Sequence, residues 1–251
     1  HSREQKKKKK TPEVSSTVTR AVSVINFLNE VSGPQGVSEI SKGLGLSTTI
    51  VHRLLTTLKI EGMVFQDPRS KLYSLGTVFL DYANKVLTEI PMAPVIEPWL
   101  MSLRNDTGET VGFYMPSGQM RICVLEYESQ QEIRRSVGIG KRLPIHIGAS
   151  GRAILAFQST ELQERLLATL PKDERSQLEQ KLEETRALGY ATNEEEISSN
   201  VAALSAPVFD KQLRVIGALS ISGPLFRWNR QTMKLHVDAL LSATEEITHS
   251  L

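Results

Sequence analysis

The chain has 251 residues, 40% of them hydrophobic and 23% charged, a composition typical of a globular protein with a sizeable core. No apolar run approaches the roughly 20 residues of a membrane-spanning helix, and no stretch has the apolar core of a secretory signal. The single cysteine, Cys123, has no partner for an internal disulfide and lies in an apolar run. We therefore expect a cytoplasmic protein without a membrane partner, in which Cys123 is a small buried side chain.

Charge is distributed unevenly along the chain. Residues 1–75 contain 12 lysines and arginines against 6 acidic residues, whereas residues 76–251 contain 18 against 22, so the net charges are +6 and −4. Part of the excess is the run Lys6 to Lys10, which we assign to a basic disordered arm over residues 1–14. This asymmetry predicts that only the front of the chain meets nucleic acid.

Residues 17–31 have apolar side chains at helical spacing and predict a first helix. It ends before residues 32–34, where Ser-Gly-Pro forms a strong helix breaker. Arg20 lies near the start of this helix, where its guanidinium would be placed to bind a backbone phosphate. An arginine on a solvated surface would have the same pattern.

Residues 37–58 predict two short helices joined by a tight turn. Apolar residues at i, i+3 and i+7 define the first helix, and Ser38 is placed to cap its start. Gly43 and Gly45 permit the sharp reversal of a helix-turn-helix. Two core helices with a solvated polar face would also fit this spacing.

The second of these helices, capped by Ser47, has distinct inner and outer faces. We expect Ile50, Leu54, Leu55 and Leu58 to face the core. The outer face has short hydroxyls, one imidazole and one guanidinium, which suit contacts to bases and phosphates in a major groove. The residues predicted to contact DNA from this segment are Ser47, Thr48, Thr49, His52 and Arg53, with Thr56 on the same face.

A β-hairpin is predicted after this helix, from strands at residues 63–66 and 71–75. Asp67 and Pro68 occupy the first two positions of a type I turn between them. Three helices followed by a hairpin make a winged helix, and we place this domain at residues 15–75. Arg69 and Lys71 would then be wing cations that bind phosphates.

Residues 76–94 predict an apolar linker helix that stops at Pro91. Its apolar face requires a partner, either a second copy of the chain or the following domain, and the sequence does not decide between them. Two-fold dimers are common among proteins that bind operator DNA.

Residues 95–251 alternate between helices and strand pairs, which predicts an α+β domain with an antiparallel sheet. The predicted strands are residues 110–114, 121–127, 133–137, 204–209 and 215–222. The predicted helices are residues 99–104, 150–157, 161–170, 171–188 and 230–249, the fourth ending at Gly189.

Three stretches match the motifs of one protein family in order and spacing: residues 17–21 with 46–58, residues 143–156, and residues 189–210. Through them, nearly the whole chain resembles the IclR family of bacterial transcriptional regulators. The chain departs from the family pattern at Asn193, where aspartate or serine is usual, and at Asn200, where glycine is frequent. Asparagine tolerates a left-handed backbone, so Asn200 need not alter its turn.

The resemblance implies a winged helix, a linker helix and a GAF-like effector domain, in a homodimer or tetramer. It places effector-binding residues at Leu143, Ala149, Ser150, Asn193, Val201 and Ala203. Backbone N–H groups after Gly148 would form a cradle for a carboxylate or another anion. The resemblance also implies a small organic effector, an aromatic or carboxylic acid. At this position neutral Asn193 removes a fixed negative charge, which changes the set of ligands that the site would reject.

An enzyme is not expected. His146, Ser150 and Asp210 have the ingredients of a catalytic triad, but the Gly-x-Ser-x-Gly spacing is absent. The histidines are scattered and the cysteine is alone, so no metal site, cofactor or catalytic residue is predicted. We assign to His146 and Glu196 the role of holding loops in place.

The sequence thus favours a ligand-responsive transcriptional regulator that binds double-stranded operator DNA. The alternative is a small-molecule sensor or assembly module whose winged helix binds a protein. A steep fall of affinity with salt would distinguish phosphate contacts from an apolar protein contact.

Overall fold

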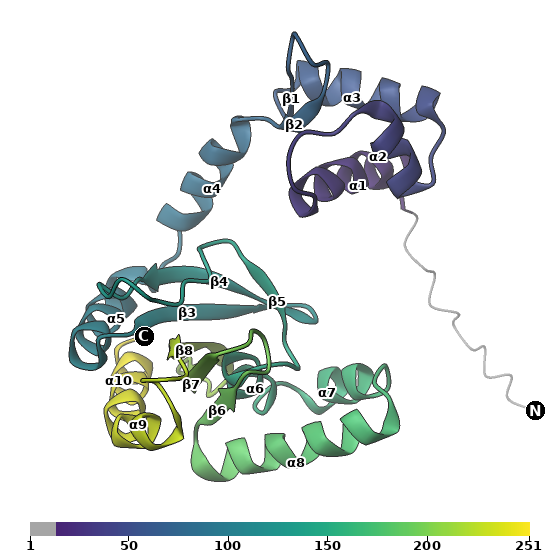
Figure 1. Cartoon of the computed structure of the whole chain (residues 1–251). Coiled ribbons are helices and arrows are strands. Elements are labelled where there is room, and N and C mark those ends of the chain that lie inside the picture. The colour runs from purple at the N-terminus through teal and green to yellow at the C-terminus, as the bar shows by residue number, and fades with distance from the viewer. Residues whose placement is uncertain (1–13) are drawn as a thin grey trace, which may run out of the picture. The chain divides into compact units, whose positions relative to one another are not determined.

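The computed structural model describes residues 14–251, which form two compact units that divide between Glu89 and Ile90 (Figure 1). Each unit has its own hydrophobic core. The expected basic arm falls on residues 1–13, outside the described residues, and on the exposed Val14. Among residues 14–251, no helix has the length and hydropathy that a membrane crossing requires.

The first unit is a winged helix followed by one further helix. Val24, Ile40 and Leu55 are fully buried where its first three helices meet. The elements are α1 (Ser16–Glu30), α2 (Val37–Leu44), α3 (Thr48–Ile60), the antiparallel pair β1 (Val64–Gln66) and β2 (Tyr73–Leu75), and α4 (Val78–Thr88). This order of helices and hairpin is the predicted one.

The turns of this unit differ in detail from the prediction. Gly36, not Ser38, is the N-cap of α2. Only Gly45 has the left-handed φ of 63° that the reversal requires, whereas Gly43 lies inside α2, where a Cβ atom would sit 2.2 Å from the Phe27 ring. The lack of a side chain at Gly43 therefore serves helix packing, not the turn.

The second unit is built on a six-stranded antiparallel sheet with strand order β5-β4-β3-β8-β7-β6. Its strands are β3 (Thr110–Ser117), β4 (Met120–Tyr127), β5 (Arg142–Pro144), β6 (Ala191–Glu194), β7 (Val201–Phe209) and β8 (Val215–Pro224). Its helices are α5 (Ala93–Thr107), α6 (Ala149–Leu155), α7 (Thr160–Leu167), α8 (Lys172–Leu188), α9 (Arg230–Leu235) and α10 (Val237–Ser250).

Alternating strand residues give the sheet two apolar faces, each with its own core. One core joins the sheet to α5, α9 and α10, with Phe113 and Leu219 at its centre. The other joins it to α6, α7 and α8, with Tyr114 and Ala218 on the sheet side (Figure 1). The α+β class with an antiparallel sheet is confirmed.

Some predicted elements are wrong or were missed. Residues 133–137 form no strand, since they lie in a loop fixed by a side chain. The short strands β5 and β6 were not predicted, and His236 divides the last helix into α9 and α10. Helix α5 is longer than predicted and contains Pro98.

Candidate functional site

The outer face of α3 presents polar side chains to solvent. Leu54, Leu55 and Leu58 are buried, and Ile50 is half-buried. The Oγ atom of Ser47 accepts a hydrogen bond from the Ile50 amide at 3.4 Å, so this residue caps the helix as predicted. The exposed residues of the face are Thr48, Thr49, His52, Arg53 and Thr56.

The four cations predicted to bind phosphates are exposed and free of ion pairs within residues 14–251. Arg20 on α1 and Arg53 on α3 line one open hollow between the two helices. Arg69 and Lys71 lie at the hairpin, where the Asp67 carboxylate accepts hydrogen bonds from the Arg69 amide at 3.0 Å and the Ser70 amide at 2.6 Å. None of the four pairs with an acidic group of residues 14–251. All four remain available to phosphates.

Helix α4 buries none of its side chains against the rest of its unit. Its apolar residues Phe79, Tyr82, Ala83 and Val86 fall on one side at helical spacing, and the Phe79 and Tyr82 rings meet edge to face with centroids 6.1 Å apart. Val86 is 64% exposed. This apolar face is unpartnered within the first unit.

In the second unit, the structure gathers all six predicted effector residues around one cavity on the α6 side of the sheet. The six are Leu143, Ala149, Ser150, Asn193, Val201 and Ala203. The cavity is also lined by Tyr114, Arg121, Arg135, Val137, Ile197, Ser198, Ser220 and Ser222. Its volume is about 30 Å³, enough for about one or two water molecules, so a larger ligand requires it to widen.

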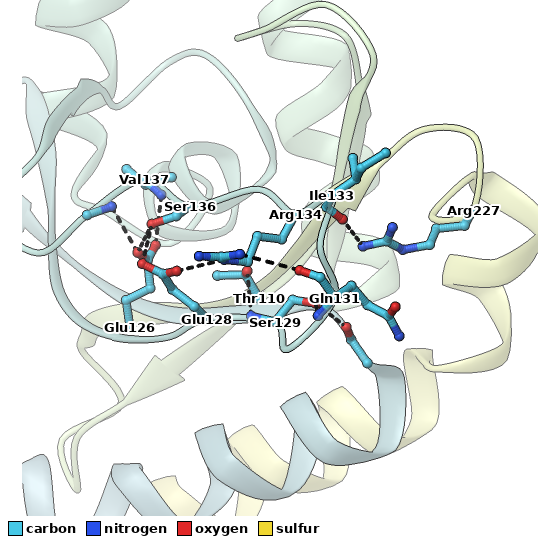
Figure 2. Close-up of polar contacts among 12 residues, drawn as sticks. Thr110, Glu126, Glu128, Ser129, Gln131, Ile133, Arg134, Ser136, Val137 and Arg227 are labelled. Atoms are coloured by element: carbon cyan, nitrogen blue, oxygen red, sulfur yellow. Dashed lines mark hydrogen bonds and ion pairs between the residues drawn. The ribbon is translucent and has the colours of Figure 1, made fainter.

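One wall of the cavity belongs to the loop between β4 and β5. The Glu126 carboxylate accepts hydrogen bonds from the Ser136 hydroxyl at 2.7 Å and from the Val137 amide at 2.9 Å (Figure 2). Nearer to the end of β4, the Arg227 side chain donates a hydrogen bond to the carbonyl oxygen of Ile133 at 2.6 Å (Figure 2). These bonds occupy backbone groups that pairing with a neighbouring strand would have used, which explains why residues 133–137 are not a strand.

The start of α6 does not offer the free amides that the sequence suggested. The Ala149 amide donates to the Asn193 side-chain oxygen at 2.9 Å, and the Gly148 amide donates to Glu196 at 3.1 Å. The expected cradle of backbone donors is therefore already occupied at these two positions by the protein's own acceptors. Asn193 and Glu196 join α6 to the segment around β6.

Glu196 holds this junction together, as expected. It also forms ion pairs with the buried Arg152 and, at 3.0 Å, with Lys181. Burial acts to raise the pKa of the Glu196 carboxyl, but the hydrogen bonds and charges of Arg152 and Lys181 outweigh it and leave the pKa below its ordinary value. The carboxylate is thus a charged structural anchor.

A second, more open hollow of about 280 Å³ lies between α8 and β6. In its lining, Glu196 forms ion pairs with both Arg152 and Lys181. The predicted effector residues, apart from Asn193, do not line this hollow.

The sequence pattern missed Arg121. It is fully buried on β4, on the same face as Cys123, and its Nε donates to the Ser150 hydroxyl at 2.8 Å. A charged residue within an apolar strand was the available signal, because lone arginines are rarely fully buried.

The residues considered for catalysis have other partners. The Ser150 hydroxyl binds Arg121, and Asp210 pairs with Arg214 at 2.7 Å. The half-buried His146 has no hydrogen bond at its inaccessible Nδ1 within residues 14–251. Burial raises the pKa of the Cys123 thiol to about 12, which makes it an unreactive apolar side chain, as predicted.

Comparison with known families assigns both units. Residues 17–68 match the model for the IclR helix-turn-helix domain, and residues 84–249 match the model described as bacterial transcriptional regulator IclR C-terminal. The chain belongs to the IclR family. Like its curated relatives, this IclR-family protein is a transcriptional regulator with a helix-turn-helix DNA-binding domain rather than an enzyme.

Individual relatives of this IclR-family chain cover nearly all of it. The HTH-type transcriptional regulator XynR of Escherichia coli is 30% identical over 219 residues, which are 83% of this chain and 86% of that protein. The crystal structure of an IclR family regulator from Brucella abortus has a TM-score of 0.83 at 22% identity, covering 99% and 97% of the two chains. An IclR homologue from Microbacterium hydrocarbonoxydans, complexed with 4-hydroxybenzoate, has a TM-score of 0.77 at 20% identity, covering 94% and 99%.

Proposed function

We propose that this chain is a ligand-responsive regulator that binds operator DNA as a homodimer or tetramer in the bacterial cytoplasm. The observation that carries the DNA-binding part is the cluster of exposed, unpaired cations, Arg20, Arg53, Arg69 and Lys71, around the polar face of α3. The helix face would read base edges, with Ser47, Thr48, Thr49 and His52 beside Arg53. The cations of α1 and the hairpin would bind the flanking phosphates.

The oligomeric part of the proposal is supported by the unpartnered apolar face of α4. A helix with Val86 64% exposed and no buried side chain gains stability when a second copy covers that face. A two-fold dimer would pair each winged helix with one half of an operator.

The ligand-responsive part is supported by the cavity on the α6 side of the sheet. Its lining combines apolar walls at Leu143 and Val201 with polar groups at Ser150 and Asn193, the mixture that small organic ligands require. A similarly folded IclR homologue was crystallised with 4-hydroxybenzoate, which agrees with an aromatic or carboxylic effector here. A ligand regulates if its affinity differs between the DNA-binding and non-binding arrangements, by about 1–3 kcal/mol in typical cases.

Selection of bound fragments from genomic DNA by the purified protein tests this function. The proposal predicts a pseudo-palindromic site in front of a small set of genes, with occupancy that changes when the effector is added. Recovery of unrelated fragments alone would contradict operator recognition and would favour the alternative, a sensor module whose winged helix binds a protein.

A further inference from the structure

Arg121 is a buried cation held rigidly in place. Its side chain is fully buried, Nε donates to the Ser150 hydroxyl at 2.8 Å, and Nη1 donates to the carbonyl oxygen of Pro144. The guanidinium carbon lies 5.9 Å from the centre of the Tyr114 ring. Two directional bonds and an aromatic neighbour fix the plane of the guanidinium.

The space around this guanidinium depends on two glycines. A Cβ atom at Gly151 would lie 2.7 Å from Nη1, and a Cβ atom at Gly148 would lie 3.2 Å from Nη2. A side chain at Gly151 would collide with the guanidinium, and one at Gly148 would crowd it. Ile145 and Ile197 crowd these positions as well, so the start of α6 packs closely against the guanidinium and its neighbours.

The third nitrogen of Arg121 is unused. Nη2 is inaccessible to solvent and has no hydrogen-bond partner among residues 14–251, although Arg121 lines the cavity. Burial lowers the pKa of Arg121 to about 10, which still leaves it charged at neutral pH. A buried charge whose N–H donors have no partner destabilises the protein unless an acceptor forms hydrogen bonds with them.

The cavity supplies no counter-charge of its own. No aspartate or glutamate lines it, whereas Arg135 from the β4–β5 loop adds a second cation to the wall. Glu196 interacts with Arg121 at longer range, but its oxygens are held by Arg152, Lys181 and the Gly148 amide. The missing partner is therefore an anion that enters from outside.

We propose that Arg121 recognises the carboxylate of a small organic acid, with the two N–H donors of Nη2 binding its oxygens. This inference rests on the proposed function, because it names the chemistry of the effector that the same cavity receives. Because the cavity of about 30 Å³ must widen for any ligand larger than water, a carboxylate, which needs less widening, is favoured over a bulkier phosphate ester. The apolar part of the acid would lie against Leu143 and Val201, and neutral analogues would leave Nη2 unpaired.

The test compares acids with their uncharged amides. Acetate, propionate and benzoate, each beside its primary amide, are titrated into the full chain by isothermal titration calorimetry. We expect at least one acid to bind about tenfold or more tightly than its amide, since hydrogen bonds to charged groups are worth roughly 10- to 100-fold in affinity. Equal binding of acid and amide, or binding of none of the acids, would overturn the proposal.

Variants then assign the effect to this residue. Arg121→Met should weaken binding of the acid by about 10- to 100-fold, and Arg121→Lys should retain part of it. Arg142→Met removes an exposed arginine next to the cavity wall and serves as the matched control, with unchanged affinity for the acid. Unchanged affinity in a folded Arg121→Met would overturn the proposal. If that variant does not fold, the acid–amide comparison and Arg121→Lys decide.

Failure of this inference is distinguishable from failure of the proposed function. Operator binding by the unliganded protein tests the function alone. An operator complex that responds to neutral compounds but not to acids would refute the role of Arg121 and leave the regulator intact.

Discussion

Replacing Glu196 with glutamine should destabilise the second unit by about 2–3 kcal/mol at neutral pH. The carboxylate is the only acidic partner within ion-pair distance of Arg152 in residues 14–251, and the Arg152 side chain is only 4% exposed. Removing one partner of a buried pair typically costs about 3–5 kcal/mol. Glutamine keeps the shape and one acceptor, so the cost falls below that range.

The same argument fixes the pH dependence. The folded-state pKa of Glu196 lies below its ordinary value of 4.5, so the stabilisation is fully present above pH 4.5 and is lost as the pH falls through the folded pKa. The gap in unfolding free energy between the wild type and Glu196→Gln should therefore be constant near neutrality and shrink at acid pH.

Urea unfolding followed by tryptophan fluorescence measures this gap. The two tryptophans of the chain, Trp99 and Trp228, both lie in the second unit, so the signal reports that unit alone. Glu183→Gln on the exposed side of α8 is the matched control and should match the wild type. The anchoring role of Glu196 would be refuted if Glu196→Gln and Glu183→Gln unfolded at the same urea concentration at pH 7. It would also be refuted if the difference in unfolding free energy between the wild type and Glu196→Gln stayed the same down to pH 3.5.

Two further predictions concern the first unit. Arg53→Ala should weaken operator binding by about 1–3 kcal/mol in an electrophoretic or anisotropy assay. Arg53→Lys should recover only the part of this affinity that comes from the positive charge, because lysine lacks the two-pronged contact to a base. An unchanged affinity of Arg53→Ala would show that α3 does not contact the operator. Val86→Glu should raise the dimer dissociation constant at least about tenfold in sedimentation analysis, because two buried carboxylates would meet an apolar face. Thr88→Glu, on the polar side of α4, is the control and should have no effect, whereas dimerisation unaffected by Val86→Glu would place the interface elsewhere.

The winged helix could be predicted from sequence because its signals are local. Apolar spacing, the Ser47 cap and the Asp67–Pro68 turn each act within a few residues. The strand expected at residues 133–137 failed because the Glu126 carboxylate takes up the amides of Val137 and Gly138 from across the loop. Such a contact has no local signature.

The cavity could be predicted only in part. The family pattern led to six residues that do line one cavity, but it gave no weight to Arg121 and suggested free amides at the start of α6. Both errors have one cause, since the partners of these groups are remote in sequence. Arg121 meets Ser150, and the Ala149 amide meets Asn193.

The salt dependence of operator affinity is the most direct test of this protein as a DNA-binding regulator. If Arg20, Arg69 and Lys71 bind phosphates in both copies of a dimer, the logarithm of the association constant should fall with the logarithm of salt concentration at a slope of about −5. A slope of about −3 would mean that about half of these contacts form. A slope near zero would contradict DNA binding through this surface.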